Sequence, residues 1–449
     1  MKKIFTSMML LLAIAAGMSI VSCNKKQAPE KKYTAEEQAN KLDATGEAFI
    51  NELDLDNWKA TSDVVIPAIL YIESDNIDMS EAPAPEIETK EEKVDVEKLV
   101  WTRTYTVDMS KAKGHYTINA EGKGSKESGD FKDFQIAFTT EGHNYVADIE
   151  FTNSDKTVLI NYDEYEAGYY NDENGQYVSC PGMVRKSSSY LVLPAKMTGN
   201  FTADGTKHFT VEGNLSYNGV TDPRELTNLK EITINADLAV TAGDYALGLT
   251  KLSLAGGTFD EALTLKRNKK QLLELTSKAT GIALLDTPKS KVDYDGDGID
   301  DEPIAEGDSK SDIPFACDNA QVALDVLGQV QVKGDIKFND LYNKYLSLAT
   351  AEPKNVEEAN ALLAQLEPYY NLNVYYDKGS VVQASVRAKA FENEEGMMDI
   401  TAVINFQDGT SQAVPKFFTG ENFGKTYAAL EKLVGKVQEY IQSMVPAKE

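Results

Sequence analysis

The stretch "DYDGDGIDD", residues 293–301, contains five aspartates, and the first three of them alternate with other residues. Calcium takes six to eight oxygen ligands, and alternate acidic residues on a tightly turning loop can point several carboxylates inward. Gly298 stands where such loops need a sharp turn, and a backbone carbonyl supplies one further oxygen. The predicted ligands are Asp293, Asp295, Asp297, Asp301 and the carbonyl of Ile299.

This stretch resembles the D-x-D-x-D-G-x-x-D loops of thrombospondin type 3 repeats, dockerins and EF-hands. It departs from them at the twelfth position, where Ile304 replaces the usual bidentate acid, and its flanks do not read as helices. The resemblance implies a single Ca²⁺ loop that orders a connector. The alternative is a solvated acidic connector that binds no ion.

The first 23 residues carry the chemistry of membrane anchoring. Lys2 and Lys3 precede an apolar run too short to span a bilayer comfortably, and "SIVSC" ends at Cys23. The stretch resembles the lipobox of bacterial lipoproteins, which implies an acylated Cys23 at the mature N-terminus and an outer-membrane anchor. The polar residues 24–27 lack the acids that direct some such proteins to the cell surface, which favours a periplasm-facing protein. The alternative is an ordinary secretory peptide.

Two further cysteines, Cys180 and Cys317, remain for redox chemistry. An oxidising periplasm permits a disulfide between them. The alternative is two separately buried thiols.

A cluster of tyrosines interleaved with acids, residues 162–177, is compatible with glycan contact. Aromatic rings stack on sugar faces and carboxylates accept hydrogen bonds from sugar hydroxyls; Tyr165, Tyr169 and Tyr170 are the candidate contacts. The alternative is that tyrosine suits half-buried strand positions with its hydroxyl in water.

Charge and motifs exclude several function classes. The formal net charge is −26, which disfavours a nucleic-acid partner. The three histidines lack the spacing of a zinc site, and the sequence contains no P-loop, no dinucleotide fingerprint and no G-x-S-x-G. We therefore expect no enzymatic activity.

Apolar periodicity predicts an α+β fold. Thr34 and Glu37 form a capping box before a helix. From Trp101 to about residue 280 the period is two, typical of an antiparallel meander with one wet face, and a slip before Leu252 predicts a bulge. The acidic residues 73–98 read as a loop or linker. Helices around 338–350 and 355–368, three strands and a final amphipathic helix complete the chain.

The stripe of that final helix runs through Phe423, Tyr427, Leu430, Val434, Val437, Ile441 and Met444. It predicts a helix packed across the sheet, with a partner helix as the alternative.

The predicted organisation has five parts. They are a signal peptide (1–22), a tether (23–33), an N-terminal helix with a large antiparallel β domain covered by helices (34–286), an acidic calcium-type connector (287–312) and a smaller α+β portion (313–449). We expect a membrane-anchored binding or scaffold protein that takes an unknown protein or small-molecule ligand. The alternatives are a carrier of lipid or another apolar ligand in a half-barrel-like sheet, and a glycan-binding protein.

Titration calorimetry tests the calcium loop. We expect the wild-type chain to bind Ca²⁺ with a Kd of about 10⁻⁴–10⁻³ M, as extracellular modules do, and Asp295→Ala/Asp297→Ala to abolish the heat. Asp130→Ala/Asp155→Ala removes the same charge outside the connector and should leave the heat intact. Equal heats from the wild type and the loop variant would exclude the site.

Overall fold

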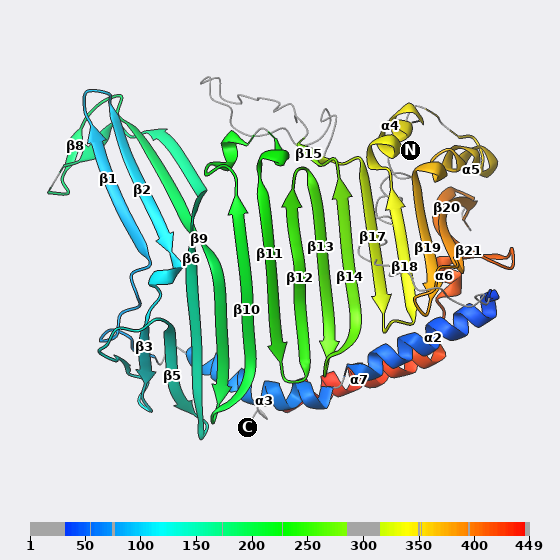
Figure 1. The fold of residues 1–449 in the computed structure, drawn as a ribbon, viewed down its shortest axis with the longest axis horizontal. Coiled ribbons are helices and arrows are strands. Elements are labelled where there is room, and N and C mark those ends of the chain that lie inside the picture. Colours follow the sequence, from blue (N-terminus) through cyan, green and yellow to red (C-terminus); the bar gives the residue numbers. More distant parts are fainter. Residues whose placement is uncertain are drawn as a thin grey trace.

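A computed structural model describes residues 32–53, 55–73, 77–172, 174–226, 228–284, 315–348, 351, 353–393 and 396–444 (Figure 1). The described α-helices are α2 (Ala35–Glu52), α3 (Leu55–Ile72), α4 (Phe338–Leu348), α5 (Val356–Ala364), α6 (Val414–Phe417) and α7 (Gly424–Met444).

The larger part of the described chain is strand. The strands before the longest connector are β1 (Glu88–Asp95), β2 (Val100–Asp108), β3 (Gly114–Ile118), β4 (Gly124–Lys126), β5 (Phe134–Thr140), β6 (His143–Glu166), β7 (Tyr169–Asn171), β8 (Tyr177–Ser179), β9 (Val184–Ala203), β10 (Thr206–Asn218), β11 (Thr233–Ala242), β12 (Tyr245–Ala255), β13 (Thr258–Arg267), β14 (Lys270–Thr280) and β15 (Ala283–Leu284). After it come β16 (Phe315–Ala316), β17 (Asn319–Val326), β18 (Val330–Ile336), β19 (Tyr370–Tyr376), β20 (Ala384–Glu392), β21 (Met398–Phe406) and β22 (Ser411–Ala413). The predicted α+β class holds in the coarse sense that a large sheet carries a few helices.

One open sheet of 18 described strands organises the chain. Its main order is β4-β3-β5-β6-β9-β10-β11-β12-β13-β14-β17-β18-β19-β20-β21-β22. Among the described strands, β4 pairs only with β3 and β22 only with β21, so the sheet does not close.

The sheet forks at β9. Residues 196–203 of β9 pair with β10, whereas residues 184–192 pair in parallel with β2. Pro194 lies between the two pairings, where a missing backbone N–H is tolerated. β2 in turn pairs with β1, so this ribbon leaves the main sheet beside β10 (Figure 1).

Residues 73–98, predicted as a loop, contain strand β1. Its sequence "ETKEEKVD" has no apolar alternation because most of its side chains are exposed, and its pairing with β2 sets Glu92 opposite Arg103. An edge strand of this kind is held by its backbone ladder and leaves no apolar pattern in the sequence.

Strand alternation separates an apolar face of the sheet from a polar face. In the central strands Val240 pairs with Leu247, Leu247 with Leu265, and Leu265 with Leu273. Partners in register project to the same side, so apolar side chains form continuous rows across the strands. The predicted bulge is confirmed, because the β12 register shifts between Leu249 and Lys251.

The described helices cover the two ends of the apolar face. At one end Val64 and Ala68 of α3 pack on Phe138, Tyr145 and Ala203 of β5, β6 and β9. At the other end α2 and α6 pack on β19–β21, α4 packs near the end of β18, and α5 packs on β20 and β21. Between these ends α2, α3 and α7 run along the lower ends of the strands (Figure 1).

Helix α2 begins as predicted and is fixed to the sheet by a buried amide. Thr34 caps its N-terminus in a full capping box with Glu37. The side chain of Gln38, 1% exposed, donates to the Gln383 carbonyl at 2.7 Å and accepts from the Tyr376 hydroxyl at 3.0 Å. Burial raises the pKa of Tyr376 far above its ordinary value, so this hydroxyl stays a donor.

Helix α7 is attached to α2. The carboxylate of Asp43 in α2 accepts from the backbone N–H of Thr426 at 2.8 Å and caps the first turn of α7. A Cβ on Gly46 would lie 2.5 Å from the Thr426 hydroxyl, so glycine is needed for this close approach.

The stripe predicted to pack across the sheet is for the most part exposed. Phe423, just before α7, is buried, but Tyr427, Leu430, Val434 and Val437 are exposed. The prediction was wrong because α7 packs beside α2 instead, and its neighbouring face, with Ala429 and Leu433, lines a small pocket between the two helices.

The portions predicted on either side of 287–312 share one sheet. β14 pairs antiparallel with β17 from Leu273↔Val326 to Thr280↔Asn319. The connector itself lies outside the described residues.

Replacing Gln38 by leucine tests the attachment of α2. Gln38→Leu leaves the Tyr376 hydroxyl and the Gln383 carbonyl without the amide, and a buried group that loses its partner costs about 1–3 kcal/mol. We expect the free energy of unfolding in urea to fall by about 2–3 kcal/mol. Glu36→Leu, at an exposed position of the same helix, should change it by less than about 0.5 kcal/mol. Equal losses would contradict the assignment.

Candidate functional site

Two of the predicted sites lie outside the described residues. They are the acylation site, Cys23, and the calcium-type loop with Asp293, Asp295, Asp297, Ile299 and Asp301. Within the described part of the chain, no group of three or more His, Cys, Asp and Glu side chains is arranged to hold a metal ion.

The proposed disulfide is not formed. Cys180 and Cys317 are both free thiols. Cys180 lies just before β9, whereas Cys317 lies just before β17, and β10 to β14 separate these two strands. Neighbouring strands are about 4.8 Å apart, so this separation far exceeds the roughly 7 Å that a disulfide can bridge between Cα atoms. Burial raises the pKa of the Cys317 thiol.

Two of the three candidate glycan-contact tyrosines gather around Trp101. The Tyr169 ring lies 6.0 Å from the Trp101 ring, and the Tyr165 hydroxyl accepts from Arg185 Nη1 at 2.7 Å. The guanidinium of Arg185 is 5.0 Å from the Trp101 ring and that of Arg103 is 4.1 Å from it.

The third tyrosine, Tyr170, follows Tyr169 on β7 and therefore projects to the other side of that strand. Trp101 is only 1% exposed, so its ring is held between cations and protein and offers no face to a sugar. Tyr177, 74% exposed, and Tyr165, 41% exposed, are the accessible rings of the group. Tyr169 and Tyr170 are half-buried on a strand, the position that the alternative describes, and glycan contact stays a prediction.

Ion pairs reinforce this end of the sheet. Arg103 pairs with Glu92 across the β1–β2 ladder. Partial burial acts to raise the pKa of Glu92, but hydrogen bonds from Lys90 and Arg103 hold it below its usual value.

The central strands carry an uncovered apolar surface, which we call the open apolar face. It comprises the residues of β11–β14 that share the apolar side in register: Ile234, Ala236, Leu238, Val240, Leu247, Leu249, Leu252, Leu254, Phe259, Leu263, Leu265, Leu273 and Leu275.

The described chain covers these side chains only in part. None of the thirteen is buried: Leu238 and Leu247 are exposed, the latter to 56%, and the other eleven are half-buried. On the neighbouring strands β17 and β18, Leu324, Val322 and Val330 of the same rows are buried. The described helix contacts with the sheet fall mainly on β5, β17 and β20–β22, on either side of the open apolar face.

The open apolar face carries almost no charge. On the apolar side of β11–β14, we consider the rows that lie between the Tyr245–Arg267 pair and the Leu254–Phe259 pair. Glu261 is the one ionisable side chain in these rows. Its carboxylate accepts a hydrogen bond from the Ser277 hydroxyl at 2.9 Å. The polar face of the same strands carries Asp237, Lys251, Asp260 and Lys278. Water is therefore favoured on one side of the sheet and disfavoured on the other.

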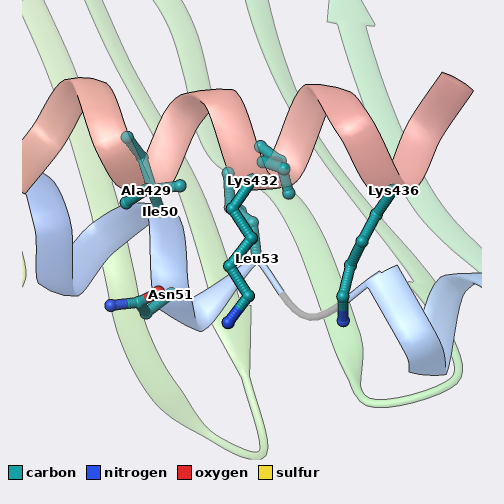
Figure 2. Close-up of a pocket in the computed structure, with 7 residues that line it drawn as sticks. Ile50, Asn51, Leu53, Ala429, Lys432 and Lys436 are labelled. Carbon is teal, nitrogen blue, oxygen red and sulfur yellow. The ribbon is translucent and has the colours of Figure 1, made fainter.

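A small pocket lies between α2 and α7 (Figure 2). Its volume is about 100 Å³ and its lining includes Ile50, Leu53, Lys432 and Lys436. Sites for drug-sized ligands are about 300–1,000 Å³, so this pocket is too small to hold a lipid.

Sequence reasoning predicted the apolar alternation but not that it would stay uncovered. The sequence did contain a signal for this: it predicts many consecutive strands and few helices, too few to cover one whole face of the sheet. Within the described chain, no helix has the length and apolar character that crossing a membrane requires.

Comparison with known proteins identifies no family. Neither a protein-family model nor a curated protein sequence matches the chain. Among solved structures, the chain is similar to a porin-like protein from Bacteroides vulgatus ATCC 8482, with 9% identity and a TM-score of 0.13 over 57% of this chain and 96% of that one.

Proposed function

We propose that the chain is a membrane-anchored, non-enzymatic binding protein outside the cytoplasm whose binding surface is the open apolar face. The observation that carries this proposal is a contiguous apolar surface of thirteen described side chains, none of them buried. Monomeric soluble proteins rarely expose apolar patches larger than a few hundred Å², and larger ones mark interaction sites.

A carrier of lipid or another apolar ligand is the second candidate. It is favoured by the helices that border the open apolar face at its lower edge and at both ends (Figure 1). Against it, the face is open rather than enclosed, so a single acyl chain would be shielded on one side only, whereas small-ligand sites bury about 70–90% of the ligand.

Anchoring through Cys23 is the second part of the proposal. The lipobox resemblance supports it, and each buried CH₂ of an acyl chain contributes about 0.8 kcal/mol to membrane binding. We expect the wild-type chain to fractionate with outer membranes and to incorporate labelled palmitate. Cys23→Ser should incorporate none and leave the membrane fraction, whereas Cys180→Ser should behave as the wild type. Palmitate labelling of Cys23→Ser would contradict this site.

A photo-reactive residue tests whether the open apolar face is a binding surface. We expect Leu249→benzoylphenylalanine to yield a covalent adduct when cells are irradiated, because the Leu249 side chain lies in the middle of the face. The adduct is measured by gel shift and mass spectrometry of the purified chain.

Ala239→benzoylphenylalanine provides the matched control. Ala239 is exposed and lies on the polar face of the neighbouring strand, opposite Gly248. It should give no adduct. Absence of any adduct from position 249, or equal adducts from both positions, would refute the proposed surface.

A further inference from the structure

We infer that the open apolar face binds the same face of a second copy of this chain, so that two sheets form a sandwich. This inference rests on the proposed function, because it names the partner of that surface. Two sheets that pack face to face lie about 10 Å apart and interdigitate the side chains of their inner faces. Each copy would then supply the second layer that the other lacks.

The area of the face is sufficient for a stable dimer. Strand β10 extends the open apolar face by one strand, because Val211, Gly213, Leu215 and Tyr217 lie in register with the face residues of β11. Strands β10–β14 together carry the apolar rows Val211–Val240–Leu247–Leu265–Leu273 and Gly213–Leu238–Leu249–Leu263–Leu275, with two further rows above them. At about 4.8 Å between strands and about 6.8 Å between rows, five strands and four rows cover about 650 Å². Two copies would bury about 1,300 Å², above the roughly 1,000 Å² that a specific interface needs.

The chemistry of the face is largely self-complementary. Its two lower rows consist of leucine, valine and glycine only, and the two rows above them carry a single charge, Glu261. A two-fold axis that sets the lower rows of one copy against the upper rows of the other therefore brings mainly apolar side chains together. Glu261, in the third row, is already hydrogen-bonded to Ser277. Within these four rows the other charges lie on the polar face and would remain in water in the dimer.

The helices fit this arrangement. They stand on the apolar side along the lower ends of the strands (Figure 1). A helix is about 10–12 Å across, which matches the gap between two packed sheets. A two-fold axis parallel to the helices would place α2 and α3 of each copy against the upper strand ends of the other copy. The helices of the two copies would then cover opposite edges of the sandwich.

Light scattering coupled to size exclusion tests the dimer on the full chain carrying Cys23→Ser, which lacks the acylation site. We expect twice the monomer mass at micromolar concentration. Leu238→Glu/Leu247→Glu places two charges per copy in the interface and should weaken association by at least about 100-fold, because an unpaired buried charge is strongly unfavourable. Ala239→Glu/Thr250→Glu adds the same charge to the polar face and should leave the dimer intact.

A second measurement keeps the test independent of folding. In a mixture of ¹⁴N- and ¹⁵N-labelled chains, Leu249→benzoylphenylalanine should give mixed-isotope cross-links to β10–β14 of the other copy, and circular dichroism should show that the glutamate variants keep their strands. A monomer whose position 249 cross-links to lipid or to another protein would overturn the dimer while leaving the proposed surface standing. A monomer that gives no adduct at all would overturn both.

Discussion

The structure depends on one constraint, which is how much of a wide apolar sheet face a few helices can cover. A helix covers a strip about 10 Å wide, whereas a strand of ten residues is about 33 Å long. Helices α2, α3 and α7 run across the strands rather than along them, so they shield the lower strand ends and leave the central part of the apolar face without a helix in the described chain.

Local packing explains where the helices are fixed. Gln38 joins α2 to the Tyr376 end of the sheet, and Ala68 of α3 packs on β5 and β6 at the other end. Between these points the Glu52 backbone carbonyl accepts from the Tyr245 hydroxyl at 2.7 Å. The helices are thus attached at both ends and along the lower edge, and the leucine rows above this line stay open.

Charged residues are distributed unequally between the two faces of the sheet. The acidic character of the chain, with a net charge of −26, keeps the polar face and the loops hydrated. Negative charge on the apolar side would oppose the association of two such faces. Between the Tyr245–Arg267 and Leu254–Phe259 rows of β11–β14, however, Glu261 is the one charged residue on that side. Charged and apolar side chains are thus separated onto opposite faces of the sheet.

The sequence by itself determined the local structure: the capping box at Thr34, the two-residue period of the strands and the bulge before Leu252 follow from short-range stereochemistry. It could not reveal the edge strand β1, whose exposed, charged side chains leave no apolar alternation, nor the outward stripe of α7. The periodicity of a strand indicates that one of its faces is apolar, but it does not indicate which helix or partner packs on that face. Only the tertiary structure decided that, because coverage depends on where helices far apart in the chain come to lie on the sheet.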